Sequence, residues 1–297
     1  MPDPRFDGSG VALVTPFDAD GVNARVLAEM VEWHIGEGTD ALIVCGSTGE
    51  AAAMSVPEQG VAVRAAVAAA AGRVPVIAGC GGSDTAVVRA LARGAAKVGA
   101  DALLLSAPPY NRPSRAGLIA HFRAVMDAGD LPVIIYNVPG RAAVDIPPDV
   151  VEELAEDTRV VGVKEASGNL SQVAELALRV GDRISLWSGN DDQVLPVMSL
   201  GGRGVISVLA NVAPAATHRM ARAYLDGDRE TALDLQLHFL PLIGALFAES
   251  NPIPVKTAVK WLGFDVGELR LPLVAPAERT RERLIDALAE SGLRPLT

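Results

Sequence analysis

Short apolar runs alternate with longer segments of helical periodicity over the first three quarters of the chain. Eight of these runs predict strands, because each is short, apolar and bounded by polar or turn residues. They are Val11–Thr15, Ala41–Cys45, Val74–Gly79, Ala102–Ser106, Val133–Tyr136, Val160–Lys164, Ile184–Ser188 and Gly204–Val208. Strands that are apolar on both faces are typical of a parallel sheet covered by helices.

Each predicted strand is followed by a segment with helical periodicity, and several of these segments begin with Asn, Asp, Ser or Pro, as helices do. They are Asn23–Gly36, Pro57–Gly72, Asp84–Val98, Ser114–Ala128, Pro147–Glu156, Leu170–Val180, Asp191–Leu200 and Ala213–Leu225. Eight strands that each precede a helix predict an α/β fold of the (β/α)₈ TIM-barrel type.

A doubly wound sheet would produce a similar alternation, but its dinucleotide fingerprint is missing. The stretch "GCGGSDT" (79–85) lacks the GxGxxG spacing, and "GSTGE" (46–50) is not a phosphate-binding P-loop. After Leu225 the alternation stops, and the remaining periodic segments predict helices only. We therefore expect a catalytic barrel over residues 1–225 and a C-terminal helical region over residues 226–297.

Composition narrows the class of protein. A net charge of −10 argues against a nucleic-acid partner, which requires a basic surface. No apolar run approaches the ~18 residues of a membrane span, and the N-terminus has no signal-peptide pattern, so we expect a cytoplasmic protein. Cys45 and Cys80 form no disulfide framework and are expected to be small buried residues. The four histidines lack metal-ligand spacing, so no metal site is expected.

The stretch "VVGVKEASGN" (160–169) ends a predicted buried strand with Lys164. Taken alone, such a lysine is most simply a rim residue that extends its ammonium group to water. The alternative is a nucleophilic amine in a pocket. The barrel fold favours the second interpretation, because the chemistry of these folds lies at the carboxyl ends of the strands.

Other polar residues follow the predicted strands at the same end of the barrel. In "GSTGE", Ser47 and Glu50 have the spacing of a helix capping box, while Ser47 and Thr48 together with backbone N–H groups could bind a carboxylate; both interpretations stay open. Tyr110, Tyr136 and Arg141 follow or end later strands. Asp191 and Asp192 are expected to cap the helix that they open.

These residue types have a common chemical logic. An unprotonated lysine attacks a ketone and forms a Schiff base that serves as an electron sink. Burial or nearby cations must first lower its pKa from about 10.4 toward 7–8. Tyrosine and serine hydroxyls can relay protons, and an arginine fork can hold a second carboxylate.

The motifs "GSTGE", "APPYNRPS", "YNVPGR", "VVGVKEASGN", "WSGND", "GGRGVISV" and "NPIPVK" resemble, in order over nearly the whole chain, those of the dihydrodipicolinate synthase family. This family belongs to the pyruvate-dependent class I aldolases, which also include N-acetylneuraminate lyase. The resemblance implies a barrel with a C-terminal helical region, usually a homotetramer of paired dimers, that condenses pyruvate with aspartate semialdehyde in lysine and diaminopimelate biosynthesis. No cofactor is implied.

The resemblance also implies roles for individual residues. Lys164 matches the lysine that forms the pyruvate Schiff base. Tyr136, Ser47 and Tyr110 match a proton-relay triad, in which Tyr110 reaches into the neighbouring subunit's site. The matching substrate-binding residues are Thr48 for the pyruvate carboxylate, Arg141 for the aldehyde's carboxylate, and Gly189 and Ile206 as main-chain positions lining the pocket.

Two departures bear on the subfamily. Ser47-Thr48 stands where the synthases usually have two threonines, and "GSTGE" is common among the neuraminate lyases, whereas Arg141 and "KEASGN" favour the synthases. The alternative activity is cleavage of a 2-keto-3-deoxy sugar acid through the same enamine. A protein that only binds a keto acid would be expected to lack part of the lysine, tyrosine and hydroxyl set. The family's lysine-inhibition positions correspond here to Val56, Gln59, Ser83, Val87 and Pro109, from which we expect no inhibition by lysine.

Overall fold

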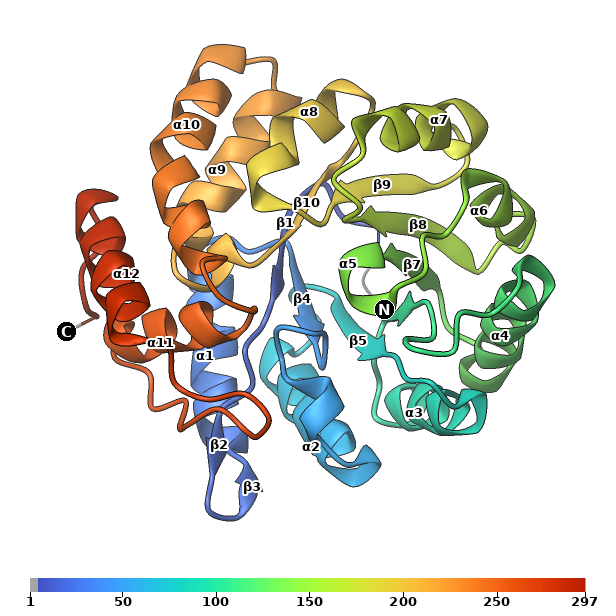
Figure 1. Cartoon of the computed structure of the whole chain (residues 1–297), viewed down its shortest axis with the longest axis horizontal. Coiled ribbons are helices and arrows are strands. Elements are labelled where there is room, and N and C mark those ends of the chain that lie inside the picture. The colour runs from blue at the N-terminus through green and yellow to red at the C-terminus, as the bar shows by residue number, and fades with distance from the viewer. Residues whose placement is uncertain (1–4, 297) are drawn as a thin grey trace.

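The computed structural model describes residues 5–296. Within them, parallel strands close into a barrel in the order β1-β10-β9-β8-β7-β6-β5-β4 (Figure 1). The barrel strands are β1 (Gly8–Ala12), β4 (Ala41–Val44), β5 (Val76–Cys80), β6 (Ala102–Ser106), β7 (Val133–Asn137), β8 (Val160–Glu165), β9 (Ser185–Ser188) and β10 (Gly204–Ser207). The expected (β/α)₈ fold is confirmed.

Helices surround these strands at the places that the periodicity predicts (Figure 1). They are α1 (Ala24–Gly36), α2 (Val56–Ala70), α3 (Thr85–Lys97), α4 (Arg115–Gly129), α6 (Pro148–Leu154), α7 (Leu170–Val180), α8 (Val194–Ser199) and α9 (Pro214–Leu225). Asn23, Asp84, Ser114 and Asn169 each accept a hydrogen bond from a backbone N–H of the helix that follows. The residues that mark helix starts in the sequence thus act as caps.

The first strand lies nearer the N-terminus than expected, at Gly8–Ala12 instead of Val11–Thr15. Its early residues are small because bulky neighbours fill the space beside them. A Cβ atom on Gly10 would lie 2.7 Å from the Phe6 ring and 2.8 Å from Ile43. The Phe6 ring stacks on Trp187 with centroids 4.9 Å apart. These aromatic rings occupy the barrel interior beside the glycine and serine residues that begin β1.

Three local features were not expected from periodicity. Strands β2 (Phe17–Asp18) and β3 (Gly21–Val22) form an antiparallel hairpin, and the short helix α5 (Pro139–Ala142) follows β7. The expected helix Asp191–Leu200 is divided into a 3₁₀ turn, η2 (Asp191–Gln193), and α8. Each is too short to give a periodic signal.

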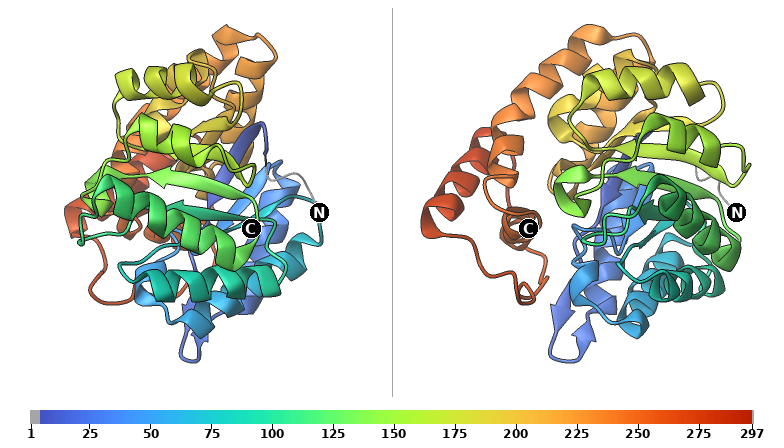
Figure 2. Two further views of the ribbon diagram at one scale, coloured as in Figure 1. Left: turned by 90° about the vertical axis from the view of Figure 1, so that its right-hand side faces the viewer. Right: turned by 45° about the vertical axis from the view of Figure 1, so that its right-hand side comes forward.

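The C-terminal region contains α10 (Arg229–Leu246), α11 (Ile253–Leu262) and α12 (Glu278–Glu290), as its sequence predicts. These helices lie along one side of the barrel, where α10 packs against α9 and α12 packs against α10 and α11 (Figures 1 and 2). The expected boundary after Leu225 coincides with the end of α9, and its status as a domain boundary stays a prediction. Within residues 5–296, no helix is both long and apolar enough to span a membrane.

Candidate active site

A cavity of about 650 Å³ opens at the carboxyl ends of the barrel strands. Loops that follow the strands form one wall, and a segment of the C-terminal region forms another. Its lining includes Ser47, Tyr136, Arg141, Asn251 and Arg270. The volume falls in the range of small-molecule sites, and the position is the one at which barrel enzymes carry their chemistry.

Lys164 lies on β8 beside Tyr136, which lines this cavity, and is not itself among the lining residues. It is only 5% exposed, and its Nζ atom lies 4.4 Å from the centroid of the Tyr136 ring. Burial lowers the pKa of Lys164 to about 8; the Arg141 charge adds to this shift and the Asp191 charge opposes it. Lys164 is therefore not a rim lysine that reaches water, and a substantial fraction of its amine is unprotonated near neutral pH.

Asp191 does not cap a helix, contrary to expectation. Its side chain makes no cap hydrogen bond; it accepts hydrogen bonds from the Ser207 hydroxyl and from the backbone N–H groups of Val208 and Leu209. Burial raises the pKa of Asp191, and these donors and the Lys164 charge lower it. Its partners lie on and after the next strand, β10, so the Asp-Asp spacing could not reveal that this carboxylate lies close enough to Lys164 to affect its charge.

Tyr136 is the second-last residue of β7 and is paired in register with Lys164. Burial raises the pKa of Tyr136, and the Arg141 charge and a hydrogen bond with the Ser47 side chain lower it. At neutral pH the phenol therefore keeps its proton and can pass one along the hydrogen bond to Ser47. The structure brings together three of the expected site residues, Lys164, Tyr136 and Ser47.

In the loop Gly46–Glu50, the structure shows which partner the Glu50 carboxylate of the "GSTGE" motif binds. The expected Ser47–Glu50 capping box does not form; the capping box of α2 is made by Ser55 and Glu58, which have the same spacing. Glu50 is instead fully buried and accepts a hydrogen bond from Lys256 Nζ at 2.7 Å. The spacing of Ser47 and Glu50 is compatible with a capping box, and only the partner Lys256, from the C-terminal region, shows that Glu50 has another contact.

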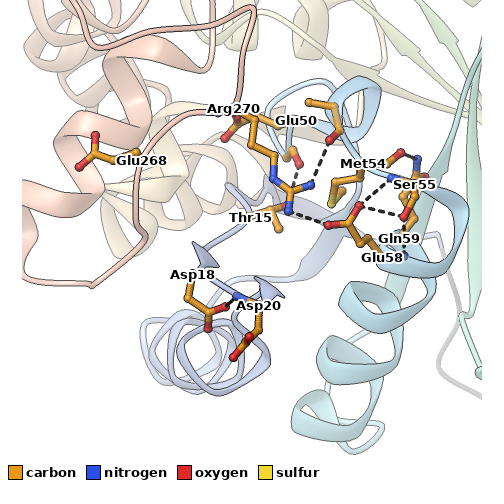
Figure 3. A network of polar contacts seen from close by, with 12 residues as sticks. Thr15, Asp18, Asp20, Glu50, Met54, Ser55, Glu58, Gln59, Glu268 and Arg270 are labelled. Atoms are coloured by element: carbon orange, nitrogen blue, oxygen red, sulfur yellow. Dashed lines mark hydrogen bonds and ion pairs between the residues drawn. The ribbon is translucent and has the colours of Figure 1, made fainter.

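Residues of the C-terminal region hold this loop from several sides (Figure 3). The Arg270 backbone N–H donates to Glu50 Oε2 at 2.9 Å, and the Arg270 guanidinium donates to the Ala53 carbonyl at 3.0 Å and to Glu58 Oε1 at 2.6 Å. Lys256 and Arg270 also lie over the Phe17 ring, 4.2 and 4.0 Å from its centroid. These contacts fix the loop that carries Ser47 and Thr48.

Arg141 lies on α5, and its Nη2 atom donates to the backbone oxygen of Asn251 at 2.7 Å. The loop that follows α5 is fastened by Asn137, whose Nδ2 atom donates to Asp145 at 2.8 Å and to the buried Glu165 at 3.0 Å. Burial raises the pKa of Glu165. The sequence-based hypothesis gives Asn137 and Glu165 no role. The sequence feature that could have identified them is that each ends a strand, directly after Tyr136 and Lys164 respectively.

The main-chain lining role expected of Gly189 and Ile206 stays a prediction, whereas Gly189 has a steric effect beside Lys164. A Cβ atom at position 189 would lie 3.0 Å from Lys164 Cε and 2.6 Å from the Ala166 side chain. The glycine therefore leaves room for the lysine side chain. Ile206 is fully buried within the barrel, and neither residue is among those that line the open cavity.

Tyr110 is not brought into the cavity of its own chain. It follows β6 in a loop, has a φ of 71°, and is 91% exposed.

Thr48 is buried, and its hydroxyl accepts a hydrogen bond from Asn251 Nδ2 at 2.9 Å. Cys45 and Cys80 are free and buried at adjacent strand ends, and burial raises the pKa of both thiols.

The pKa of Lys164 leads to a pH prediction. The rate at which low concentrations of pyruvate modify Lys164 should rise between pH 6 and 9, with a midpoint near pH 8, and level off above about pH 9, because only the unprotonated amine attacks. Asp191→Asn should shift the midpoint down, since it removes the charge that raises the pKa, and Arg141→Gln should shift it up. Trapping rates measured with cyanoborohydride across this range would test this; a rate still rising steeply at pH 9.5 in the unmodified protein would contradict it.

A barrel with a buried, partly unprotonated lysine beside a phenol is the arrangement of aldolase-type enzymes that act through a lysine imine. Comparison with known proteins supports this class. A model of the dihydrodipicolinate synthetase family matches residues 5–291. The chain belongs to this family.

Individual relatives agree along the full length. A 4-hydroxy-tetrahydrodipicolinate synthase of Thermoanaerobacter sp. (strain X514) is 53% identical over 291 residues, covering 98% of each chain. A crystal structure of dihydrodipicolinate synthase from Aquifex aeolicus superposes with a TM-score of 0.95 at 41% identity, covering 98% of this chain and 100% of the other. A structure of the enzyme from Cyanidioschyzon merolae, described as having lysine bound, gives 0.94 at 37% identity, with coverages of 97% and 99%.

Proposed function

We propose that the protein condenses pyruvate with L-aspartate 4-semialdehyde to give 4-hydroxy-tetrahydrodipicolinate, the entry step of lysine and diaminopimelate biosynthesis. The observation that carries this proposal is Lys164, a buried lysine of pKa about 8 beside the phenol of Tyr136, which lines the cavity. The identity of the two substrates is inferred from the family and from the activity for which the full-length relatives are named.

The proposed reaction uses the residues of the site in sequence. The Lys164 amine adds to the pyruvate ketone and water leaves, which forms an imine. Removal of a methyl proton, relayed through Tyr136 and Ser47, gives the enamine, whose carbon attacks the aldehyde. The amino group of the second substrate then attacks the imine carbon, closes the ring and releases the Lys164 amine.

The two carboxylates have separate binding groups in this proposal. Thr48 receives the pyruvate carboxylate and Arg141, at the cavity wall, receives that of aspartate semialdehyde. Ser47 and Tyr136 both line the cavity, and Tyr136 also lies beside Lys164, as a proton relay requires. Tyr110 completes the relay only if a neighbouring subunit inserts it, and its 91% exposure supports that arrangement.

A direct test is an assay of the purified protein with pyruvate and either aspartate semialdehyde or sugar aldehydes such as N-acetylmannosamine. We expect turnover with aspartate semialdehyde that exceeds turnover with any sugar aldehyde by orders of magnitude. The reverse preference would identify a sugar-acid lyase, the alternative that the "GSTGE" motif favours. Pyruvate binding without turnover of any aldehyde would identify a keto-acid-binding protein.

Arg141→Ala should weaken the use of aspartate semialdehyde and still allow imine formation with pyruvate, although the raised pKa of Lys164 moves that step to higher pH. A charge-assisted contact to a carboxylate contributes on the order of 1.5–3 kcal/mol, so kcat/KM for the aldehyde should fall roughly ten- to a hundredfold or more. Arg141→Lys keeps the charge without the planar fork and should recover only part of the loss. The control is Arg222→Ala on the exposed face of α9. An unchanged kcat/KM in Arg141→Ala would favour the sugar-acid alternative.

We expect that free lysine does not inhibit the enzyme. Val56 and Val87 offer no hydrogen bond to a ligand with two ammonium groups and a carboxylate, each costly to bury unpaired. The polar residues nearby already have partners: Gln59 Nε2 donates to the Ala51 carbonyl at 3.1 Å, and Ser83 Oγ donates to the Pro109 carbonyl at 2.9 Å. The check is the initial rate at saturating pyruvate while lysine is titrated to millimolar concentration. Inhibition below 1 mM would overturn the expectation.

We further propose a homotetramer built from pairs of subunits that share Tyr110, acting in the cytoplasm without a cofactor. The support is the family resemblance and the exposure of Tyr110. Sedimentation of the purified protein at micromolar concentration should give the mass of four chains. A stable monomer with full activity would contradict both the assembly and the shared tyrosine.

A further inference from the structure

Asn251 lies in the C-terminal region, between α10 and α11, and contacts both carboxylate-binding groups of the proposed site. Its Nδ2 atom donates to the Thr48 hydroxyl at 2.9 Å. Its backbone oxygen accepts from Arg141 Nη2 at 2.7 Å. The residue is buried and forms part of the cavity lining.

The direction of the first hydrogen bond matters for the chemistry of Thr48. A hydroxyl group has one proton to donate and two lone pairs that accept. Because the Thr48 oxygen accepts from the Asn251 amide, its proton is not used there and is free to donate to a carboxylate oxygen. The amide thus selects the donating orientation of the hydroxyl.

The second hydrogen bond has a similar effect on Arg141. A guanidinium has five N–H donors in a fixed plane. The Asn251 carbonyl engages one of them and so fixes the plane, while the remaining donors stay available for a carboxylate. Since one residue holds both groups, their separation is fixed as well.

Asn251 does this at a cost in its own hydrogen bonding. Within the described residues its Oδ1 atom is buried and has no hydrogen-bond partner. An unpaired buried acceptor is unfavourable for stability, so each such atom calls for another explanation. A residue retained only to stabilise the fold would be expected to have both ends of its amide satisfied.

We propose that Asn251 is a positioning residue for substrate binding: its side chain orients the Thr48 hydroxyl to donate to the pyruvate carboxylate, and its backbone carbonyl fixes Arg141 for the second carboxylate. The proposal rests on the proposed function, because it takes Thr48 and Arg141 as the carboxylate-binding residues. The C-terminal region thereby supplies a part of the active site that the barrel strands do not.

The experiment compares Asn251→Ala, Asn251→Asp, Thr48→Val and the double variant Asn251→Ala/Thr48→Val. Asn251→Ala should raise the KM for pyruvate roughly five- to thirtyfold, the effect of losing one hydrogen bond in a buried site. The KM for aspartate semialdehyde should change much less, because the backbone carbonyl that holds Arg141 remains. The melting temperature should change little, since the unpaired Oδ1 atom is removed together with one hydrogen bond.

Asn251→Asp is nearly isosteric but presents only acceptors, so the Thr48 proton would turn toward it and away from pyruvate. Its KM for pyruvate should exceed that of Asn251→Ala. Gln193→Ala, which removes an exposed amide that donates to the Gly168 carbonyl, is the matched control and should leave both KM values unchanged.

The double variant tests whether Asn251 acts through Thr48 or independently of it. If Asn251 acts through Thr48, its replacement should add nothing to the effect of Thr48→Val on the pyruvate KM. Additive effects, an unchanged pyruvate KM in Asn251→Ala, or equal rises of both KM values together with a lower melting temperature would overturn the inference. If Thr48→Val itself leaves the pyruvate KM unchanged, the assignment of Thr48 in the proposed function fails instead.

Discussion

Lys164→Ala is expected to abolish turnover, with no residual rate above background, because the variant lacks the amine that forms the imine. Borohydride reduction in the presence of pyruvate should add one reduced pyruvyl group to the peptide that contains Lys164 in the unmodified protein, and none in the variant. Peptide mass spectrometry measures both results. Labelling of a different lysine would disprove the mechanism.

The control for this experiment is Lys260→Ala, which removes a surface lysine paired with Glu268. An exposed pair contributes little, so activity and labelling should be retained. Because Lys164 is buried beside Tyr136, the variant protein should also be checked for folding by its melting temperature. A folded but inactive Lys164→Ala protein isolates the loss of the nucleophile.

Tyr110→Phe should lower kcat by about 10²–10⁴, the contribution that a positioned proton-transfer group makes. Its side chain is 91% exposed in the single chain, so the substitution should leave the stability of the subunit nearly unchanged. Measurement of kcat with both substrates saturating tests the expectation. A kcat within threefold of the unmodified protein would show that the tyrosine is not part of the relay.

A mixing experiment tests whether Tyr110 acts in a neighbouring subunit. Tyr110→Phe and Lys164→Ala proteins, each inactive alone, should regenerate activity when their subunits exchange, because some mixed pairs contain one site with both residues intact. Exchange should be confirmed by mass spectrometry of differently labelled chains. Confirmed exchange with no gain in activity would rule out the shared site.

The barrel and the position of Lys164 near the end of a strand could be predicted because both depend on local patterns. The strand that ends in Lys164 is an apolar run with a lysine at its carboxyl end, and a barrel places all such ends together. The same argument predicted that Tyr136, Ser47 and Arg141 lie at this end of the barrel. Residues identified through adjacent strand ends were thus accessible from sequence alone.

The contacts of Glu50, Asp191 and Asn251 could not be predicted, because their partners lie elsewhere in the chain. Ser47–Glu50 and Ser55–Glu58 have identical spacing, and only the buried Lys256 determines that the first pair is not a capping box. Asp191 has the position of a helix cap, yet its hydrogen bonds come from the end of β10. Where local and long-range partners compete for a side chain, spacing shows only the local one.

The contact between Glu50 and Lys256 joins residues 206 positions apart. During synthesis from the N-terminus, the loop with Ser47 and Thr48 therefore leaves the ribosome long before the segment that fastens it. Until α11 follows, the Glu50 carboxylate has no ammonium partner and its loop has no anchor. A nascent or truncated chain with every barrel strand in place would still lack an assembled pocket, so the appearance of activity reports that synthesis has passed Lys256 and Arg270.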